Sequence, residues 1–210
     1  MTGLSALFAI FVSAVFGSEF SERGFDELRS KSGFLYPQYQ SVFTEYQKMT
    51  EEQINEFFTQ SKREFKGDNP LSPLPRIISA EEYDQILKKG VKQRARALVA
   101  FLKDHYSGDK KYLKAGIMEA RVVEAITRRT LDHKMEGKLD TKKISFLYGP
   151  DIIRDKNGMW RVIEDNPGYI GGLGDLLLAQ DLIFKKWDSI LNREDYRPAQ
   201  EFYNVIAERY

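Results

Sequence analysis

The feature that most constrains the fold of this chain is a β-hairpin signal in its second half. Two short runs of strand-forming residues flank Asn157-Gly158, a dipeptide typical of two-residue hairpin loops. With such a loop, the antiparallel ladder sets Asp151 opposite Glu164, and directly opposed side chains have Cβ atoms about 4.5–5.5 Å apart. Asn166 lies two residues beyond Glu164 and therefore shares its face. The hairpin is expected to bring two carboxylates and an amide oxygen together.

These oxygen groups have the chemistry of a site for a hard cation. Mg²⁺ prefers oxygen ligands and is usually held by one or two carboxylates together with the phosphates of a nucleotide. Without a cation, two apposed carboxylates repel each other, and one of them tends to keep its proton. We therefore predict that Asp151, Glu164 and Asn166 are metal ligands. The alternative is that these residues form turns and caps at the strand ends.

The same register has a consequence for the other face of the hairpin. It places Arg154 opposite Arg161, which is unfavourable unless both side chains find anionic partners. An acidic group or a phosphate is therefore expected at that face. The alternative is a three-residue loop, which would shift the register.

The hairpin resembles the metal-binding hairpin of ATP-grasp enzymes, in which an Asp, a short hairpin and Glu-x-Asn follow one another. D-alanine:D-alanine ligases have a similar version that ends in Pro-Gly. Further motifs occur in the order found in circularly permuted ATP-grasp proteins, namely Phe25-Asp26-Glu27, Pro75-Arg76-Ile77-Ile78, Lys92-Gln93-Arg94-Ala95-Arg96-Ala97-Leu98, Phe101-Leu102-Lys103-Asp104-His105-Tyr106, Gly116-Ile117 and Asp151-Ile152-Ile153-Arg154-Asp155. The resemblance extends from about residue 25 to about residue 180.

This resemblance implies an α+β fold, in which a helical N-terminal part is followed by a mixed or antiparallel sheet that carries the metal-binding hairpin. It also implies an ATP-dependent ligase that uses Mg²⁺ or Mn²⁺. Such an enzyme activates a carboxylate as an acyl phosphate, which an amine then attacks. The implied partners are ATP and a small-molecule or peptide substrate with a carboxylate or an amine.

Two features depart from the family pattern. After Glu164-Asp165-Asn166, bacterial members typically continue with an Arg and a Pro-Ser-Gly stretch, whereas this chain continues with Pro167-Gly168-Tyr169. The segment with the adenine pocket and the phosphate-binding lysines is expected after the hairpin, and the sequence ends at Tyr210. We therefore expect that a C-terminal half is missing. The alternative is a non-catalytic secreted or subunit-like module that keeps the hairpin as a scaffold or a Ca²⁺ site.

Three arginines and two glycines are candidate contacts for an anionic ligand such as ATP. Arg94 shares a helix face with apolar residues, where a guanidinium needs a partner, and arginine suits a carboxylate or phosphate. Arg76 follows a proline-rich loop, and Arg161 lies on the hairpin. Gly171 and Gly172 precede an expected helix start, where backbone N–H groups favour anions. The alternatives are arginines paired with structural acids and a flexible glycine turn.

Composition is that of a globular protein, since 42% of the residues are hydrophobic and 30% are charged. The net charge is only +1, and Lys and Arg are spread among nearly equal numbers of Asp and Glu, so nothing favours a nucleic-acid partner. Cys is absent from the sequence, which excludes disulfides, thiolate metal sites and a Cys nucleophile.

The N-terminus carries a compartment signal. An apolar run from Leu4 to Phe16, followed by Gly17-Ser18, resembles a secretory signal peptide, although no Lys or Arg precedes it. The run is short for a transmembrane helix, so no stable membrane span is expected. We predict a signal peptide over residues 1–17 and a secreted or secretory-pathway protein. The alternative is a cytoplasmic protein with a buried N-terminal segment.

The remaining sequence divides into a helical segment over residues 18–70 and a partial circularly permuted ATP-grasp domain over residues 71–210. Thr50 with Gln53, and Ser79 with Glu82, are capping-box signatures that predict two helix starts. The patterns also predict a helix over residues 118–131 and a strand over residues 144–148.

Overall fold

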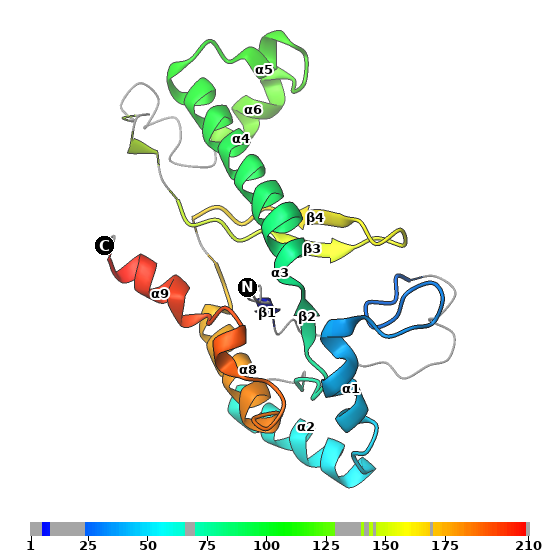
Figure 1. Cartoon of the computed structure of the whole chain (residues 1–210). Coiled ribbons are helices and arrows are strands. Elements are labelled where there is room, and N and C mark those ends of the chain that lie inside the picture. Colours follow the sequence, from blue (N-terminus) through cyan, green and yellow to red (C-terminus); the bar gives the residue numbers. More distant parts are fainter. Residues whose placement is uncertain are drawn as a thin grey trace.

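The computed structural model of the chain describes residues 6–8, 24–65, 70–128, 140, 143–144, 146–168 and 170–208. The signal-peptide prediction lies outside these residues, apart from the backbone of residues 6–8, and stays a prediction. Groups of helices are separated by short strands along the chain (Figure 1). The elements are β1 (Ala6–Phe8), η2 (Pro37–Tyr39), α1 (Gln40–Tyr46), α2 (Glu51–Phe65), β2 (Arg76–Ile78), α3 (Ala80–Glu82), η3 (Tyr83–Leu87), α4 (Lys88–Ser107), α5 (Lys111–Lys114), α6 (Ala120–Thr127), β3 (Asp151–Arg154), β4 (Trp160–Glu164), α8 (Leu173–Lys186), η5 (Arg193–Asp195) and α9 (Gln200–Ala207).

Both predicted helix starts are confirmed, because local side chains cap them. The Gln53 N–H donates to Thr50 Oγ1 at 3.2 Å, and the Thr50 N–H donates to Gln53 Oε1 at 2.9 Å, so the capping box before α2 is complete. At α3, the Ser79 hydroxyl oxygen accepts from the Glu82 N–H at 3.2 Å. The helix that begins there continues through a π-helical stretch, η3, into α4.

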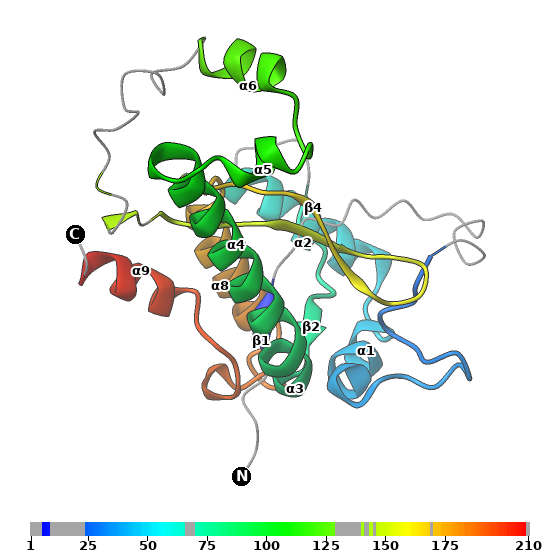
Figure 2. The ribbon, with the colours of Figure 1, turned by 90° about the horizontal axis from the view of Figure 1, so that it is seen from above.

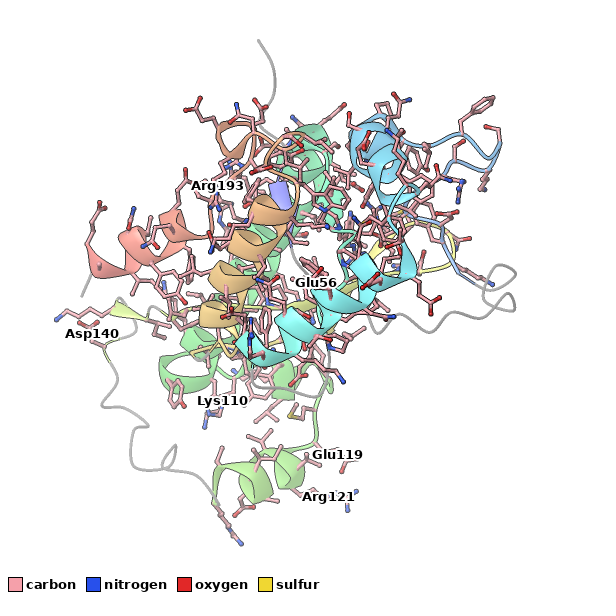
Figure 3. All side chains as sticks on the ribbon, turned by 90° about the horizontal axis from the view of Figure 1, so that it is seen from below. Glu56, Lys110, Glu119, Arg121, Asp140 and Arg193 are labelled. Atoms are coloured by element: carbon pink, nitrogen blue, oxygen red, sulfur yellow. The ribbon has the colours of Figure 1, made fainter. Side chains whose placement is uncertain are left out.

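The hydrophobic core lies where α1, α2 and β2 meet α8. Its buried members include Tyr39, Val42, Phe57, Ile77 and Ile183. Figure 3 shows α2 and α8 side by side, as their shared core residues require. This core therefore draws on both sides of the proline-rich loop around residues 70–75, rather than on the N-terminal helices alone.

Two buried hydrogen bonds fasten chain segments to this core. The Trp187 Nε1–H donates to the Pro73 carbonyl at 2.7 Å. The Ile77 N–H donates to the Tyr39 hydroxyl at 2.7 Å. Because both donors are buried polar groups, these bonds remove the cost of leaving them unpaired. The proline-rich loop and β2 are thereby held against the helices.

The described strands form two separate two-stranded antiparallel sheets, one of β1 with β2 and the other of β3 with β4. Together with the helices they make a mixed architecture that is consistent with the expected α+β class. The predicted strand over residues 144–148 is reduced, among its described residues, to an isolated bridge between Tyr148 and Pro167. The predicted helix over residues 118–131 is α6, whose described bounds are shorter.

The long helix α4 runs past the β3–β4 hairpin and ends near α5 and α6, away from the core (Figures 1 and 2). Glu119 and Arg121, at the start of α6, lie at the edge of the molecule (Figure 3). None of the helices in the described part of the chain is both long and apolar enough to cross a bilayer. Since α4 passes the hairpin, it is the element that can position the hairpin's polar residues.

Candidate functional site

The β3–β4 hairpin has the predicted ends but a different turn. Asp151 pairs with Glu164, as predicted. The turn is not a two-residue loop, because the Asp155 N–H donates to the Met159 carbonyl at 2.9 Å and leaves three residues between them. Gly158, the last of these three, adopts a φ of +79°, a left-handed conformation that glycine takes without steric cost.

A compensating irregularity restores the register at the far end of the hairpin. The pairs next to the turn are Arg154 with Trp160 and Ile153 with Arg161, so the predicted opposition of Arg154 and Arg161 is wrong. A register shift follows between Asp151 and Ile152, where β3 advances by one residue and β4 by two. The longer turn and this bulge offset each other, and the two acids face one another after all.

Asp155 holds the turn. Its carboxylate accepts from the backbone N–H groups of Asn157 and Met159, at 2.9 and 3.0 Å, and from Arg161 Nε at 2.9 Å. The hydrogen bond from Arg161 and the one from the Met159 backbone lower the pKa of Asp155 below its usual value. A side chain that bonds the backbone ahead of it competes with the two-residue turn, which explains the three-residue loop.

The predicted metal ligands lie at the open end of the hairpin. Asp151 and Glu164 are exposed and are paired across the ladder, and Asn166 Nδ2 lies 3.3 Å from Asp151 Oδ1. The Asn166 amide thus donates to Asp151, and a half-turn of the amide would exchange its nitrogen for its oxygen. Two carboxylates and one amide oxygen are donors that a hard metal ion prefers, so the set fits such an ion once the amide is turned.

Among the described residues, no group of three His, Cys, Asp or Glu side chains is arranged to hold a metal ion. The predicted set does not have that composition, since it consists of two carboxylates and one amide. Its assignment as a metal site stays a prediction that depends on Asn166 as much as on the acids.

Asp165, between the two predicted ligands Glu164 and Asn166, is held by two other elements. Arg94 on α4 donates to it twice, from Nε to Oδ1 and from a terminal nitrogen to Oδ2, both at 2.6 Å. The Tyr148 hydroxyl donates to Oδ1 at 2.5 Å. These bonds lower the pKa of Asp165 to about 2, while burial and the bond to Asp165 raise the pKa of Tyr148 to about 12. Asp165 is therefore ionised, and its carboxylate is bound by Arg94 and Tyr148 of the same chain.

A second ion-pair group fastens the turn end of the hairpin. Arg154 donates to Glu82 Oε2 at 2.6 Å, and Trp160 Nε1 donates to Glu82 Oε1 at 2.9 Å. The Arg154 guanidinium lies 4.0 Å from the centre of the Trp160 ring, within the range of a cation–π interaction. Arg76 also donates twice to Glu27, and Arg154 Nε lies 3.5 Å from Glu27 Oε1. We call these five residues the turn-end cluster.

The three arginines predicted as anion contacts each have a carboxylate of the same chain as partner. Arg76 pairs with Glu27, Arg94 with Asp165, and Arg161 with Asp155. This is the pairing with structural acids that the sequence left open. Contact of any of these guanidinium groups with a ligand stays a prediction.

The two predicted glycine contacts lie at the start of α8. Gly172 is the residue before the helix and has a φ of +74°. Gly171 precedes it in the same turn. The helix that follows is 14 residues long, and the first N–H groups of a helix have no partners within the helix, which is the basis of the predicted anion contact. No other observation bears on that role, and it also stays a prediction.

An open hollow of about 450 Å³ lies between α4 and the segment before the hairpin. Its lining is mainly apolar with two cationic side chains, and consists of Ala95, Arg96, Val99, Ala100, Lys103, Ile144, Phe146 and Tyr148. Tyr148 belongs both to this lining and to the group around Asp165. A molecule in the hollow would therefore touch a residue that is one hydrogen bond away from the predicted ligand strand.

Comparison with known protein families supports the resemblance seen in the motifs. A profile described as circularly permuted ATP-grasp type 2 matches residues 75–209, which is more than half of the chain. This chain belongs to the circularly permuted ATP-grasp family. The matched region contains the hairpin, α4 and α8, so every predicted ligand and anion contact lies inside it.

Several curated proteins resemble parts of this chain. A protein of Synechocystis sp. is 35% identical over 139 residues, which cover 66% of this chain and 28% of that protein. An uncharacterised protein of Mycobacterium leprae is 35% identical over 98 residues, or 46% of this chain and 17% of its own length. A protein of Frankia alni with the provisional name glutamate–cysteine ligase 2-3 is 27% identical over 169 residues, or 74% of this chain and 19% of its own length.

The chain thus spans well under a third of these relatives. No solved structure matches it significantly. The family, the Frankia alni protein and a Frankia casuarinae protein with the provisional name glutamate–cysteine ligase 2-2 support a carboxylate–amine ligase-like family, in which ATP is the usual substrate and Mg²⁺ the usual cofactor.

Sequence reasoning missed the residues that hold the hairpin of this ATP-grasp chain in place. In the sequence, Asp165 is only the middle residue of a motif, and Tyr148 is only part of an expected strand. Their partners are distant in sequence, since Arg94 and Asp165 are 71 residues apart. The signal that was available is the position of Arg94 on an apolar helix face, which requires an anion nearby.

Proposed function

We propose that this chain is the metal-binding portion of an ATP-dependent carboxylate–amine ligase. The observation that carries the proposal is the pairing of Asp151 with Glu164, with the Asn166 amide 3.3 Å from Asp151, at the position of the family's metal hairpin. Membership of the ATP-grasp family and the ligase names of two Frankia relatives support the reaction class.

The proposed reaction proceeds in two displacements. A substrate carboxylate oxygen attacks the γ-phosphorus of ATP, which releases ADP and leaves an acyl phosphate. An amine then attacks the acyl carbon, loses a proton and expels inorganic phosphate, so an amide is formed. Because charge moves among phosphate oxygens in the first step, positioning and electrostatic stabilisation are the main tasks of the protein.

The residues of this chain would contribute to the first displacement. Asp151, Glu164 and Asn166 would hold Mg²⁺ or Mn²⁺, which supplies charge neutralisation at the transferring phosphate. Gly171 and Gly172 precede the α8 N-terminus, where backbone N–H groups could donate to a phosphate. Arg94 is paired with Asp165 next to the hairpin and Arg161 with Asp155 within it, and both would reach a phosphate only if they exchanged or shared those partners.

Calorimetric titration of the 210-residue chain with ATP, with and without Mg²⁺, tests this proposal. We expect Mg²⁺-dependent ATP binding by the wild-type chain and its loss in the Asp151→Asn variant, which removes one charged ligand. Asp188→Asn, an exposed aspartate just beyond α8, is the matched control and should bind as the wild type does. Equal binding by the wild type and Asp151→Asn would remove the metal assignment.

The alternative function is a non-catalytic module that keeps the hairpin as a scaffold or binds Ca²⁺ there. The structural observation that favours a scaffold role is the heavily bonded turn end, where Glu82, Arg154 and Trp160 are joined to one another. Titration with Ca²⁺ in the absence of nucleotide separates the two. Tight Ca²⁺ binding without any effect of Mg²⁺ on ATP binding would favour the module.

A further inference from the structure

Asp165 lies between two predicted metal ligands but faces away from them. Side chains alternate along an extended strand, so Glu164 and Asn166 share one face and Asp165 has the other. The interactions of Asp165 follow this geometry, because its carboxylate is occupied by Arg94 and Tyr148 at 2.5–2.6 Å, whereas Asn166 contacts Asp151. The backbone that carries the ligands is therefore fixed from its opposite face.

The backbone next to Asp165 is fixed as well. The Gly149 N–H donates to the Asn166 carbonyl at 3.1 Å, and the Gly168 N–H donates to the Leu147 carbonyl at 2.6 Å. With the Tyr148–Pro167 bridge, these bonds extend the hairpin by a short antiparallel ladder. Tyr148 lies between Leu147 and Gly149, whose backbone groups bond the opposite segment, and its hydroxyl bonds Asp165 on that same segment.

The contact with α4 has the geometry of a specific pair rather than of a loose surface ion pair. Arg94 presents two nitrogens to the two oxygens of Asp165 at equal distances of 2.6 Å. Bidentate guanidinium–carboxylate pairs restrict the relative orientation of both groups, which a single contact does not. Since α4 is a 20-residue helix, it offers a rigid reference for this part of the hairpin.

We propose that Arg94, Asp165 and Tyr148 form a positioning group that sets Glu164 and Asn166 for binding a divalent cation. This inference rests on the proposed function of the hairpin. None of the three residues would touch the cation; they act by fixing the strand that carries its ligands. Partners behind metal ligands commonly matter about 10–100-fold for metal affinity.

The test uses Mn²⁺ as the probe, with the 210-residue chain and electron paramagnetic resonance to count free ion. Asp165→Asn should weaken Mn²⁺ binding by about tenfold or more, because the neutral amide cannot accept both bonds from Arg94. Tyr148→Phe, which removes a single hydroxyl, should give a smaller loss in the same direction. In the double variant with Arg94→Met, Asp165→Asn should cause little further loss, because the two residues act through one contact.

Asp181→Asn is the matched control. Asp181 also accepts from two cationic side chains, Lys185 at 2.6 Å and Arg193 at 2.7 Å, but it lies on α8 outside the hairpin. Its substitution should leave Mn²⁺ affinity close to that of the wild type. Circular dichroism of each variant shows whether the helices are intact, so that a loss of affinity can be separated from a loss of fold.

The outcomes distinguish this inference from the proposed function. Absence of Mn²⁺ binding by the wild-type chain would overturn both. Wild-type binding that Asp151→Asn abolishes but Asp165→Asn and Tyr148→Phe leave unchanged would overturn only the positioning group. The positioning group would also be overturned if both variants lost affinity only in proportion to a loss of helical signal, because the three residues would then serve stability alone.

Discussion

The two ends of the hairpin are fastened to the rest of the protein by ion pairs of different character. At the turn end, Arg154 is 12% exposed and its partners Glu82 and Glu27 are 21% and 24% exposed. At the ligand end, Arg94 is 47% exposed and Asp165 is 25% exposed. The ion pairs at the turn end are thus largely shielded from solvent, and the Arg154 guanidinium also contacts the Trp160 ring. At the ligand end, Arg94 is open to solvent.

This difference indicates a division of tasks between the two ends. Removing one member of an enclosed ion pair leaves an uncompensated charge, which destabilises the fold, whereas an exposed pair contributes little to stability. The turn-end cluster therefore stabilises the hairpin against the body of the protein. Loss of the Arg94–Asp165 pair at the ligand end should cost little stability. The effect of losing this pair should appear in the affinity for the metal ion instead.

The largest effect is expected for Glu82→Ala, which removes a partner of both Arg154 and Trp160. Two hydrogen bonds are lost, and among the described residues the Arg154 guanidinium keeps Glu27, at a longer distance, as its remaining anionic partner. We expect the free energy of unfolding in urea to fall by about 2–3 kcal/mol, below the range for fully buried pairs because some solvent reaches these groups. Glu81→Ala, the exposed neighbour, should change it by less than about 0.5 kcal/mol. Equal effects of the two substitutions would contradict the anchoring role.

A second enclosed group, the Tyr39 hydroxyl in the core next to β2, should make the free energy of unfolding depend on pH. Burial raises the pKa of Tyr39 to about 12, against an unfolded value of about 10. The folded state thus favours the protonated form. The resulting stability is fully present below pH 10 and is lost as the pH rises from about 10 through 12.

The unfolding free energy of the wild type should therefore fall more steeply above pH 10 than that of Tyr39→Phe. By about pH 11, the wild type should have lost about 1 kcal/mol more than the variant, because its unfolded tyrosine ionises while the folded one stays protonated. Urea titrations at a series of pH values measure this, and other tyrosines cancel because both proteins contain them. Parallel curves would show that Tyr39 does not titrate at raised pH.

The smallest effect on stability is expected for Arg94→Met, which keeps the apolar stem and removes the charge of the exposed pair. Its unfolding free energy should differ from the wild type by less than that of Glu82→Ala. The difference should shrink further at about 0.5 M NaCl, because salt screens exposed charges more than enclosed ones. Arg96→Met, an exposed arginine on the same helix, is the control. An Arg94→Met effect that salt leaves unchanged would remove the contrast between the two ends.

Sequence reasoning succeeded where the determining contacts are local. The N-caps at Thr50 and Ser79 involve residues three apart, and both were found where expected, although the Glu82 carboxylate bonds Arg154 and Trp160 instead of closing a capping box with Ser79. The hairpin itself, and the pairing of Asp151 with Glu164, also follow from a short segment. In each case the residues that decide the structure lie within one turn of a helix or one reversal of the chain.

Sequence reasoning failed where two turn structures compete and where the interacting residues are distant in sequence. Asn157-Gly158 predicts a two-residue loop, but the Asp155 carboxylate stabilises a longer one by accepting two backbone N–H groups. The partners of Arg94 and Arg154 are 71 and 72 residues away, so no local pattern could reveal them. The need for a partner was visible from the sequence, but its identity was not.

The offset between the lengthened turn and the bulge couples the two ends of the ribbon. Tightening the turn to a two-residue Asn157-Gly158 loop, with no residue removed, would slide the intervening pairs by one place and, with the bulge kept, set Asp151 opposite Asp165. Loss of the bulge at the same time would return Asp151 to Glu164. A design that grafts this ribbon elsewhere must therefore transfer both irregularities together.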